Sequence, residues 1–225
     1  AEDPRIFHYQ LSSSLEEITN SAKSRYYPIE ISEMIHLIRE REARYLIVGI
    51  PCFIKSVRLL MKQDEILNQR IKFCIGLVCG HLKSARFADM LAWQTGVIPN
   101  TLQSIDFRTK LENYGANQYG VTVTGLVKDT IETKISSPVS EMFGTDWGLG
   151  FFKYKSCDYC DDVVAETADV TIGDAWLPQY VKESQGTNII IIRNPIIQRL
   201  FEEAQQSDQI FIEKLTIEQT VQSQD

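Results

Sequence analysis

Apolar residues along the chain fall into two kinds of run, one of strand length and one with helical spacing. Continuous apolar runs occupy residues 45–50 and 71–78, and the segment between them repeats apolar positions at Ile54, Val57 and Leu60. A strand that is apolar on both faces is typical of a parallel sheet covered by helices. The strand–helix–strand order therefore predicts two parallel strands and an α/β fold.

The remaining patterns add an antiparallel hairpin to this core. Residues 119–127 and 130–135 have strand patterns on either side of a turn at Lys128 and Asp129. Other helices are expected to begin at the capping residues Ser14, Ser32, Ser84 and Asn194. Other strands are expected at the short runs 104–110, 169–172, 189–192 and 210–212. The length of 225 residues suits one large domain or two small ones, and we expect one domain spanning residues 1–225.

Composition excludes several classes of protein. The net charge is −7 and the pI about 5.1, which disfavours a nucleic-acid surface. No apolar run is long enough to span a membrane. Residues 1–4 do not resemble a signal peptide, and they lack an initiator Met, a feature shared with fragments of longer proteins. Five cysteines, an odd number, do not suit a secreted disulfide framework and indicate thiolates kept for a metal in a reducing cytoplasm.

Two of the cysteines form the pair Cys157-x-x-Cys160. Such a turn places two thiolates within reach of one metal or cluster. Structural zinc sites and iron–sulfur clusters usually take four ligands, so two more are required. The alternative is an ordinary solvent-facing loop that carries two cysteines.

The other ligands are expected at the carboxyl ends of the two parallel strands. Cys52 and Cys79 each follow a predicted strand, and ligands of open α/β sheets gather at that edge. Cys74 falls inside its strand, where a free cysteine is usually a small buried hydrophobe. We therefore expect Cys52, Cys79, Cys157 and Cys160 to converge on one site, a Cys-rich cluster-binding segment added to the α/β core.

Cationic residues supply a candidate anion site. Arg108 and Lys110 are two apart in a predicted strand and would share one face. Paired cations suit an anionic ligand, although a charged edge strand exposed to solvent has the same pattern. Ser24, Arg25 and Tyr26 can together bind phosphate and stack on a ring, or form an ordinary loop.

Taken in order, these motifs resemble the coenzyme F420 hydrogenase/dehydrogenase beta-subunit family. The resemblance covers about Leu15 to Trp176 and rests on the following elements: Ser24-Arg25-Tyr26, Gly49-Ile50-Pro51-Cys52, Cys79-Gly80, Asp106-Phe107-Arg108-Thr109-Lys110, Cys157-x-x-Cys160-x-Asp162, Glu166-x-Ala168-Asp169 and Gly173-Asp174.

The resemblance implies a flavoprotein oxidoreductase that binds FAD and a [4Fe–4S] cluster. Such proteins pass electrons between coenzyme F420, or another reducible small molecule, and an iron–sulfur chain in a partner protein or a ferredoxin-like segment. By resemblance the metal ligands are Cys52, Cys79, Cys157 and Cys160, and the flavin-binding residues are Ser24, Arg25, Tyr26, Gly49, Pro51, Arg108 and Lys110. The family's upstream ferredoxin-like segment and its glycine-rich flavin segment are not found in this sequence.

Two other functions fit the same residues. Four thiolates are an equally natural zinc site, which would make the chain a zinc-stabilised binding or scaffold domain without redox activity. The chain could also be a relative that has lost its cofactors and acts by protein contact. Colour separates the redox hypothesis from the other two, because iron–sulfur proteins are brown and flavoproteins yellow, and a colourless protein with stoichiometric zinc would exclude it.

Overall fold

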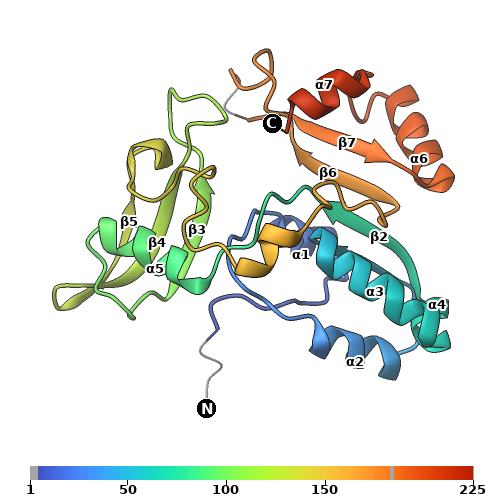
Figure 1. Cartoon of the computed structure of the whole chain (residues 1–225), viewed down its shortest axis with the longest axis horizontal. Helices are drawn as coiled ribbons and strands as arrows, with labels where there is room; N and C mark the ends of the chain where they lie inside the picture. The colour runs from blue at the N-terminus through green and yellow to red at the C-terminus, as the bar shows by residue number, and fades with distance from the viewer. Residues whose placement is uncertain (1–4, 183–184, 225) are drawn as a thin grey trace. The chain divides into compact units, whose positions relative to one another are not determined.

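The computed structural model describes residues 5–182 and 185–224, and these form two compact units (Figure 1). The first unit comprises Ala1–Met34 and His81–Tyr159, and the second comprises Ile35–Gly80 and Cys160–Asp225. The single flavin and iron–sulfur domain expected from the sequence stays a prediction.

The second unit contains a four-stranded sheet in the order β1-β2-β6-β7. Its strands are β1 (Tyr45–Gly49), β2 (Ile71–Leu77), β6 (Val170–Asp174) and β7 (Asn188–Ile192). The first three strands run parallel, whereas β7 pairs antiparallel with β6. The parallel core predicted from the apolar runs is therefore confirmed, and β7 adds an antiparallel edge that the sequence did not reveal.

Two helices connect β1 to β2 in the second unit, α3 (Pro51–Gln63) and α4 (Glu65–Arg70). Pro51 occupies the first turn of α3, where its missing N–H costs nothing. Asp64 caps α4 by accepting a hydrogen bond from the Leu67 amide. Ile54 and Val57 of α3 are fully buried, and α3 contacts both strands (Figure 1).

The structure corrects one expectation about β1. Its residues alternate between buried and exposed, and Leu46 is 50% exposed in the middle of the strand. The continuous apolar run had predicted cover on both faces. Because β1 is an edge strand whose buried residues, Tyr45, Ile47 and Gly49, all share one face, the other face is open within the described residues.

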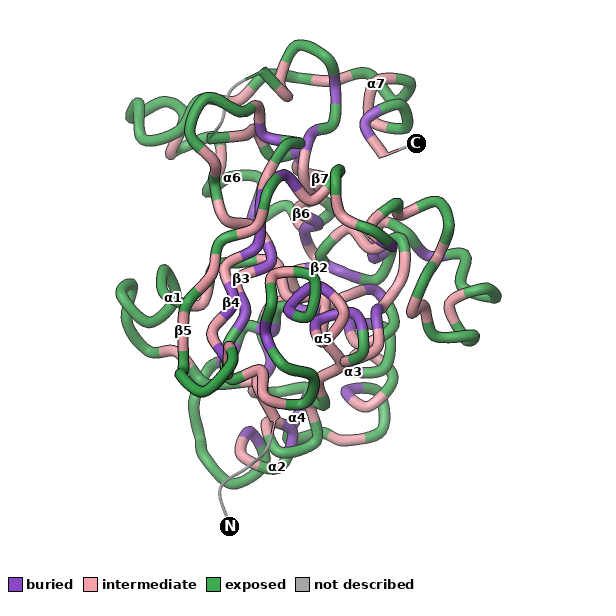
Figure 2. The backbone as a smooth tube through the Cα atoms, turned by 90° about the vertical axis from the view of Figure 1, so that its left-hand side faces the viewer, coloured by how far each residue is buried: buried purple, intermediate pink, exposed green. Residues whose placement is uncertain are grey.

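The first unit contains an antiparallel sheet of three strands, β3 (Ser104–Thr109), β4 (Gly120–Val127) and β5 (Thr130–Ile135). The predicted hairpin is confirmed, and Lys128 enters its turn with a left-handed φ of 55°. The helix α5 (Ala85–Gln94) packs Phe87 and Leu91 against Phe107 and Val123. Figure 2 shows the buried positions of β3 and β4 in purple.

The described residues also form α1 (Leu15–Ser21), α2 (Ser32–Glu40), η1 (Val139–Glu141), η2 (Lys155–Tyr159), α6 (Pro195–Gln206) and α7 (Ile217–Gln222). The predicted caps are confirmed for α1, where Ser14 and Glu17 form a capping box, and for α6, where Asn194 accepts from the Ile196 amide. No described helix has the length and apolar character that crossing a membrane requires.

The strand predicted at residues 210–212 is wrong. These residues have no regular structure, and Phe211 is 85% exposed. A strand needs a neighbour to bind its backbone N–H and C=O groups. Here the Ile212 carbonyl instead accepts a hydrogen bond from the Gln205 side chain. The apolar residues of this segment have strand propensity, but they do not pair with a neighbouring strand.

Candidate functional site

Cys52 and Cys79 leave the sheet of the second unit at the same edge. In the parallel ladder Gly49 of β1 is opposite Gly76 of β2, and each cysteine comes three residues later in its own segment. Cys52 is exposed in the first turn of α3, and Cys79 is half-buried just beyond β2. The strand-end placement predicted from the sequence is therefore what the fold shows.

The segment that carries Cys160 is tied to the exit of β2. The Cys79 amide donates to the Val163 carbonyl at 3.0 Å, and the Cys160 thiol lies 3.9 Å from the carbonyl oxygen of Asp162. The Asp162 side chain is buried, and its Oδ1 accepts from the Glu166 amide at 3.1 Å. Its Oδ2 is buried with no hydrogen-bond partner among the described residues, which is costly unless another group binds there.

Cys157 lies in the first unit, within η2. Its amide donates to the Tyr154 carbonyl at 2.9 Å, which fixes the turn. Its sulfur accepts a hydrogen bond from the Leu82 amide at 3.4 Å. The adjacent Asp158 forms an ion pair with Lys153. The sulfur therefore already has one directed N–H donor, a feature that is common around metal-bound thiolates.

Cys74 differs from the other four cysteines. It is 0% exposed in the middle of β2, and burial raises the pKa of its thiol to about 11. The group therefore stays protonated at neutral pH, as expected of a small buried hydrophobe and not of a metal ligand.

We expect Cys74→Ala to lower the free energy of unfolding by only about 1 kcal/mol, because it leaves a small cavity in a packed strand. Bound metal per chain should be unchanged. Urea denaturation together with metal analysis of the purified variant measures both quantities. Loss of the metal would mean that Cys74 belongs to the ligand set.

The expected convergence of Cys52, Cys79, Cys157 and Cys160 stays a prediction. Within residues 5–182 and 185–224, no group of three or more His, Cys, Asp and Glu side chains is arranged to hold a metal ion. The donor chemistry nevertheless fits an iron–sulfur cluster. The four thiols are exposed or half-buried, three of them lie at or near one edge of the parallel strands, and the fourth is a chain neighbour of Cys160.

The predicted flavin-binding residues are divided between the units. Ser24, Arg25, Tyr26, Arg108 and Lys110 belong to the first unit, and Gly49 and Pro51 belong to the second. Gly49 ends β1 and Pro51 begins α3, so both sit beside Cys52 in the chain. The Arg25 guanidinium lies 5.1 Å from the Phe7 ring centre, and that of Arg108 lies 4.5 Å from the Tyr119 ring centre.

Arg108 and Lys110 do not share a regular strand. β3 ends at Thr109, and its register shifts between Asp106 and Thr109. At this irregularity the Asp106 carboxylate accepts from the Arg108 amide at 3.0 Å and also pairs with Lys23. The strand expected at residues 104–110 is therefore present up to Thr109, whereas the common face of Arg108 and Lys110 and their roles stay predictions.

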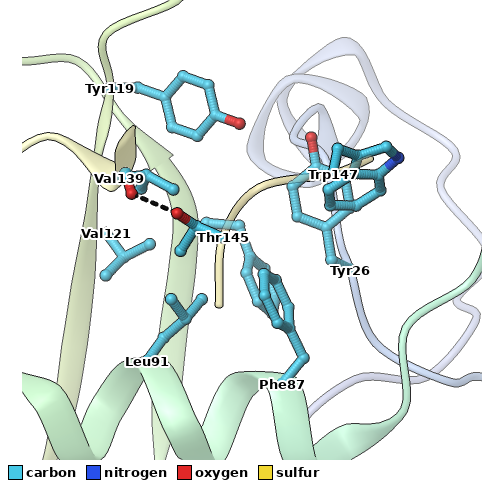
Figure 3. A pocket seen from close by; sticks show the side chains of 9 residues that line it. Tyr26, Phe87, Leu91, Tyr119, Val121, Val139, Thr145 and Trp147 are labelled. Atoms are coloured by element: carbon cyan, nitrogen blue, oxygen red, sulfur yellow. Dashed lines mark hydrogen bonds between the residues drawn. The ribbon is translucent and has the colours of Figure 1, made fainter. Parts of the chain in front are cut away.

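The predicted stacking residue Tyr26 lines a small aromatic cavity in the first unit (Figure 3). Its ring lies 4.9 Å from that of Trp147 and 5.4 Å from that of Phe107, measured between centres. Thr145 donates to the Val139 carbonyl at 2.6 Å and closes one side of the cavity. The cavity measures about 10 Å³, which is room for about one water, so in this arrangement the site is packed.

Sequence reasoning missed a polar cluster beside this cavity. Lys83 is 1% exposed, and its ammonium donates to the Phe151 carbonyl at 2.7 Å. The same nitrogen lies 4.4 Å from the Trp147 ring centre, and the His81 ring stacks on Trp147 at 4.5 Å. Burial, followed by the charge of Lys83, lowers the pKa of His81 to about 4. In the sequence, Lys83 resembles any surface lysine before a helix cap.

Comparison with known proteins relates most of the chain to one family. Residues 42–218 match the family model for the C terminus of the beta subunit of "Coenzyme F420 hydrogenase/dehydrogenase". No curated protein sequence matches the chain. A chain of the F420-reducing [NiFe] hydrogenase complex from Methanosarcina barkeri has a similar fold, with a TM-score of 0.56 and 16% identity. The match covers 88% of this chain and 61% of that one, so this chain spans about three fifths of its length. The family match extends over more than half of the sequence, and the chain therefore belongs to the coenzyme F420 hydrogenase/dehydrogenase beta-subunit family, in the part that forms its C terminus.

Proposed function

We propose that this chain is an iron–sulfur flavoprotein oxidoreductase that passes electrons between FAD, a [4Fe–4S] cluster and an external redox partner. The proposed cluster ligands are Cys52, Cys79, Cys157 and Cys160. The observation that carries the proposal is the matched exit of Cys52 and Cys79 from paired positions of β1 and β2. Family membership supports the same chemistry.

The second unit supplies electrostatic support at Cys52. This cysteine lies in the first turn of α3, a helix whose N-cap, Ile50, has no side-chain hydrogen bond. The N-terminus of a helix carries partial positive charge and unpaired amides, both of which favour a negatively charged group. A cluster held by four thiolates is such a group. When bound, it supplies single-electron transfer, and the flavin supplies hydride chemistry.

The first unit supplies the proposed anion contacts. Arg25, Arg108 and Lys110 are proposed to bind the pyrophosphate of FAD or the acidic tail of coenzyme F420. Arginine offers a planar fork for phosphate or carboxylate, and lysine offers a point charge. Because the chain carries a net charge of −7, a cationic face would help to attract an anionic cofactor.

We expect Arg108→Ala and Lys110→Ala each to weaken FAD binding by about 1.5–3 kcal/mol, because each removes one charged contact. The loss should shrink as salt is added. Isothermal titration of FAD over a salt series measures both effects. Lys62→Ala is the matched control, since it removes an exposed lysine from the far end of α3. Equal affinity of both variants and wild type would assign Arg108 and Lys110 to the solvent-exposed surface.

The proposed partners are a protein that carries an iron–sulfur chain and a reducible small molecule such as coenzyme F420. The similar chain from Methanosarcina barkeri belongs to an F420-reducing hydrogenase complex, which supports both proposals. The free thiols of all five cysteines suit a reducing cytoplasm.

A zinc-stabilised scaffold is the second candidate function, because four thiolates bind zinc equally well. Anaerobic purification followed by quantification of iron, sulfide, zinc and FAD separates the two. Iron and sulfide in near-equal amounts, together with FAD, support the redox proposal. A colourless protein with stoichiometric zinc and no flavin would overturn it.

A further inference from the structure

A short strap in the first unit fastens the Cys157 turn to the segment before α5. We define the strap as residues 151–157. The Ser84 amide donates to the Phe152 carbonyl at 2.9 Å, and the Tyr154 amide donates to the Leu82 carbonyl at 3.2 Å. Lys83 and Lys153 form an antiparallel bridge between these two bonds. The strap is therefore held by backbone pairing over three consecutive positions.

The strap uses both polar groups of the Leu82 backbone. Its carbonyl accepts from Tyr154, and its amide donates to the Cys157 sulfur at 3.4 Å. Cys157 is placed for this bond because its own amide donates to the Tyr154 carbonyl. The orientation of the Leu82 N–H toward the sulfur therefore depends on how firmly the strap is held.

The Lys83 side chain also holds the strap, through a hydrogen bond to its first residue. Its ammonium is buried, donates to the Phe151 carbonyl and faces the rings of Trp147 and Phe87 at 4.4 and 5.1 Å from their centres. Among residues 5–182 and 185–224 no carboxylate pairs with it. Burying an ammonium without a carboxylate partner is unfavourable, and the Phe151 carbonyl and the two ring faces offset only part of that penalty, so a methionine would fill this space with less loss of free energy. The charge and its hydrogen bond therefore call for a role other than packing.

We propose that Lys83 is a positioning residue, which holds the strap so that the Leu82 N–H binds the Cys157 sulfur and thereby raises the reduction potential of the cluster. This inference rests on the proposed function, because it takes Cys157 as a cluster ligand. Reduction adds negative charge to the cluster sulfurs. An N–H dipole directed at a ligand sulfur stabilises that charge, and hydrogen bonds of this kind are known to set cluster potentials.

The test compares the one-electron potential of the anaerobically loaded wild type with that of Lys83→Met and Lys83→Gln. Methionine keeps the length of the side chain but removes the donor to Phe151, whereas glutamine retains an uncharged donor. We expect Lys83→Met to bind its cluster. Its equilibrium constant for one-electron reduction should be about tenfold smaller than that of the wild type, which corresponds to a reduction potential lower by ~59 mV. We expect Lys83→Gln to recover most of the wild-type potential, because the hydrogen bond restores the strap.

Lys155→Met is the matched charge control, because it removes an exposed cation two residues from Cys157 without touching the Leu82 bond. It should shift the potential less than Lys83→Met does. A loaded Lys83→Met with the wild-type potential would overturn the inference alone. A shift shared equally by methionine and glutamine would also overturn it, because charge and not positioning would then be responsible.

A second measurement does not depend on the folding of Lys83→Met and tests the Leu82–Cys157 bond on which the inference rests. In the metal-free chain, amide hydrogen exchange of the peptide containing Leu82 should be faster in Cys157→Ala than in wild type, because the sulfur acceptor is gone. Equal exchange in the two proteins would overturn the proposed bond. A wild-type chain that takes up zinc but no iron would overturn the proposed function, and this inference with it.

Discussion

Cys160→Ser and Cys157→Ser are each expected to lose the bound cluster and to unfold more easily. Serine oxygen is a poor substitute for thiolate, and metal binding is coupled to folding because the unfolded chain has no formed site. A ligand present at one hundred times its dissociation constant stabilises the native state by about 2.7 kcal/mol, so we expect a loss of about that size. Iron per chain should fall to background.

Iron and sulfide assays and urea denaturation of the anaerobically prepared variants measure these effects. Cys74→Ala serves as the control, because it removes a cysteine that is buried inside β2. A serine variant that retains the wild-type iron content and denaturation midpoint would show that the Cys157-x-x-Cys160 pair is an ordinary loop.

Asp169→Ala is expected to destabilise the second unit by about 3 kcal/mol. Its carboxylate, 13% exposed, forms an ion pair with Arg58 at 2.7 Å and accepts from the Cys74 amide at 2.7 Å and from the Asn194 side chain at 2.8 Å. These partners come from α3, β2 and the cap of α6. Alanine would leave all three donors without this acceptor, and unsatisfied buried donors retain their full cost of desolvation.

Chemical denaturation followed by circular dichroism measures this loss. Asp161→Ala is the matched control, because Asp161 is an exposed aspartate in the same segment. Asp169→Asn, which keeps one acceptor oxygen, should lie between alanine and wild type. Equal midpoints for Asp169→Ala and Asp161→Ala would show that the three contacts do not stabilise the unit.

The parallel core and the hairpin could be predicted because local patterns determine them. A segment with helical spacing lies between the apolar runs of β1 and β2. A helical crossover of this kind joins parallel strands, as the structure shows for these two. The helix N-caps at Ser14 and Asn194 could also be predicted, because their hydrogen bonds involve residues only two or three positions away. The exit of Cys52 and Cys79 at one edge followed directly from strand direction.

Features that depend on distant partners could not be predicted. The antiparallel pairing of β7 and the absence of a strand at residues 210–212 depend on which strand edges are available, and no local pattern records that. The burial of Lys83 depends on Trp147 and Phe151, which are more than sixty residues away in the sequence. The sequence motif included Asp169 but could not predict the three donors that its carboxylate binds, because they come from separate elements.

The most direct test of the proposed cluster is electron paramagnetic resonance of the purified chain after anaerobic reduction with dithionite. We expect a low-temperature signal from a reduced [4Fe–4S] cluster, near-stoichiometric with the chain and absent from Cys160→Ser. A spin-silent wild-type protein with zinc bound to its cysteines would show that the proposed cluster is not present.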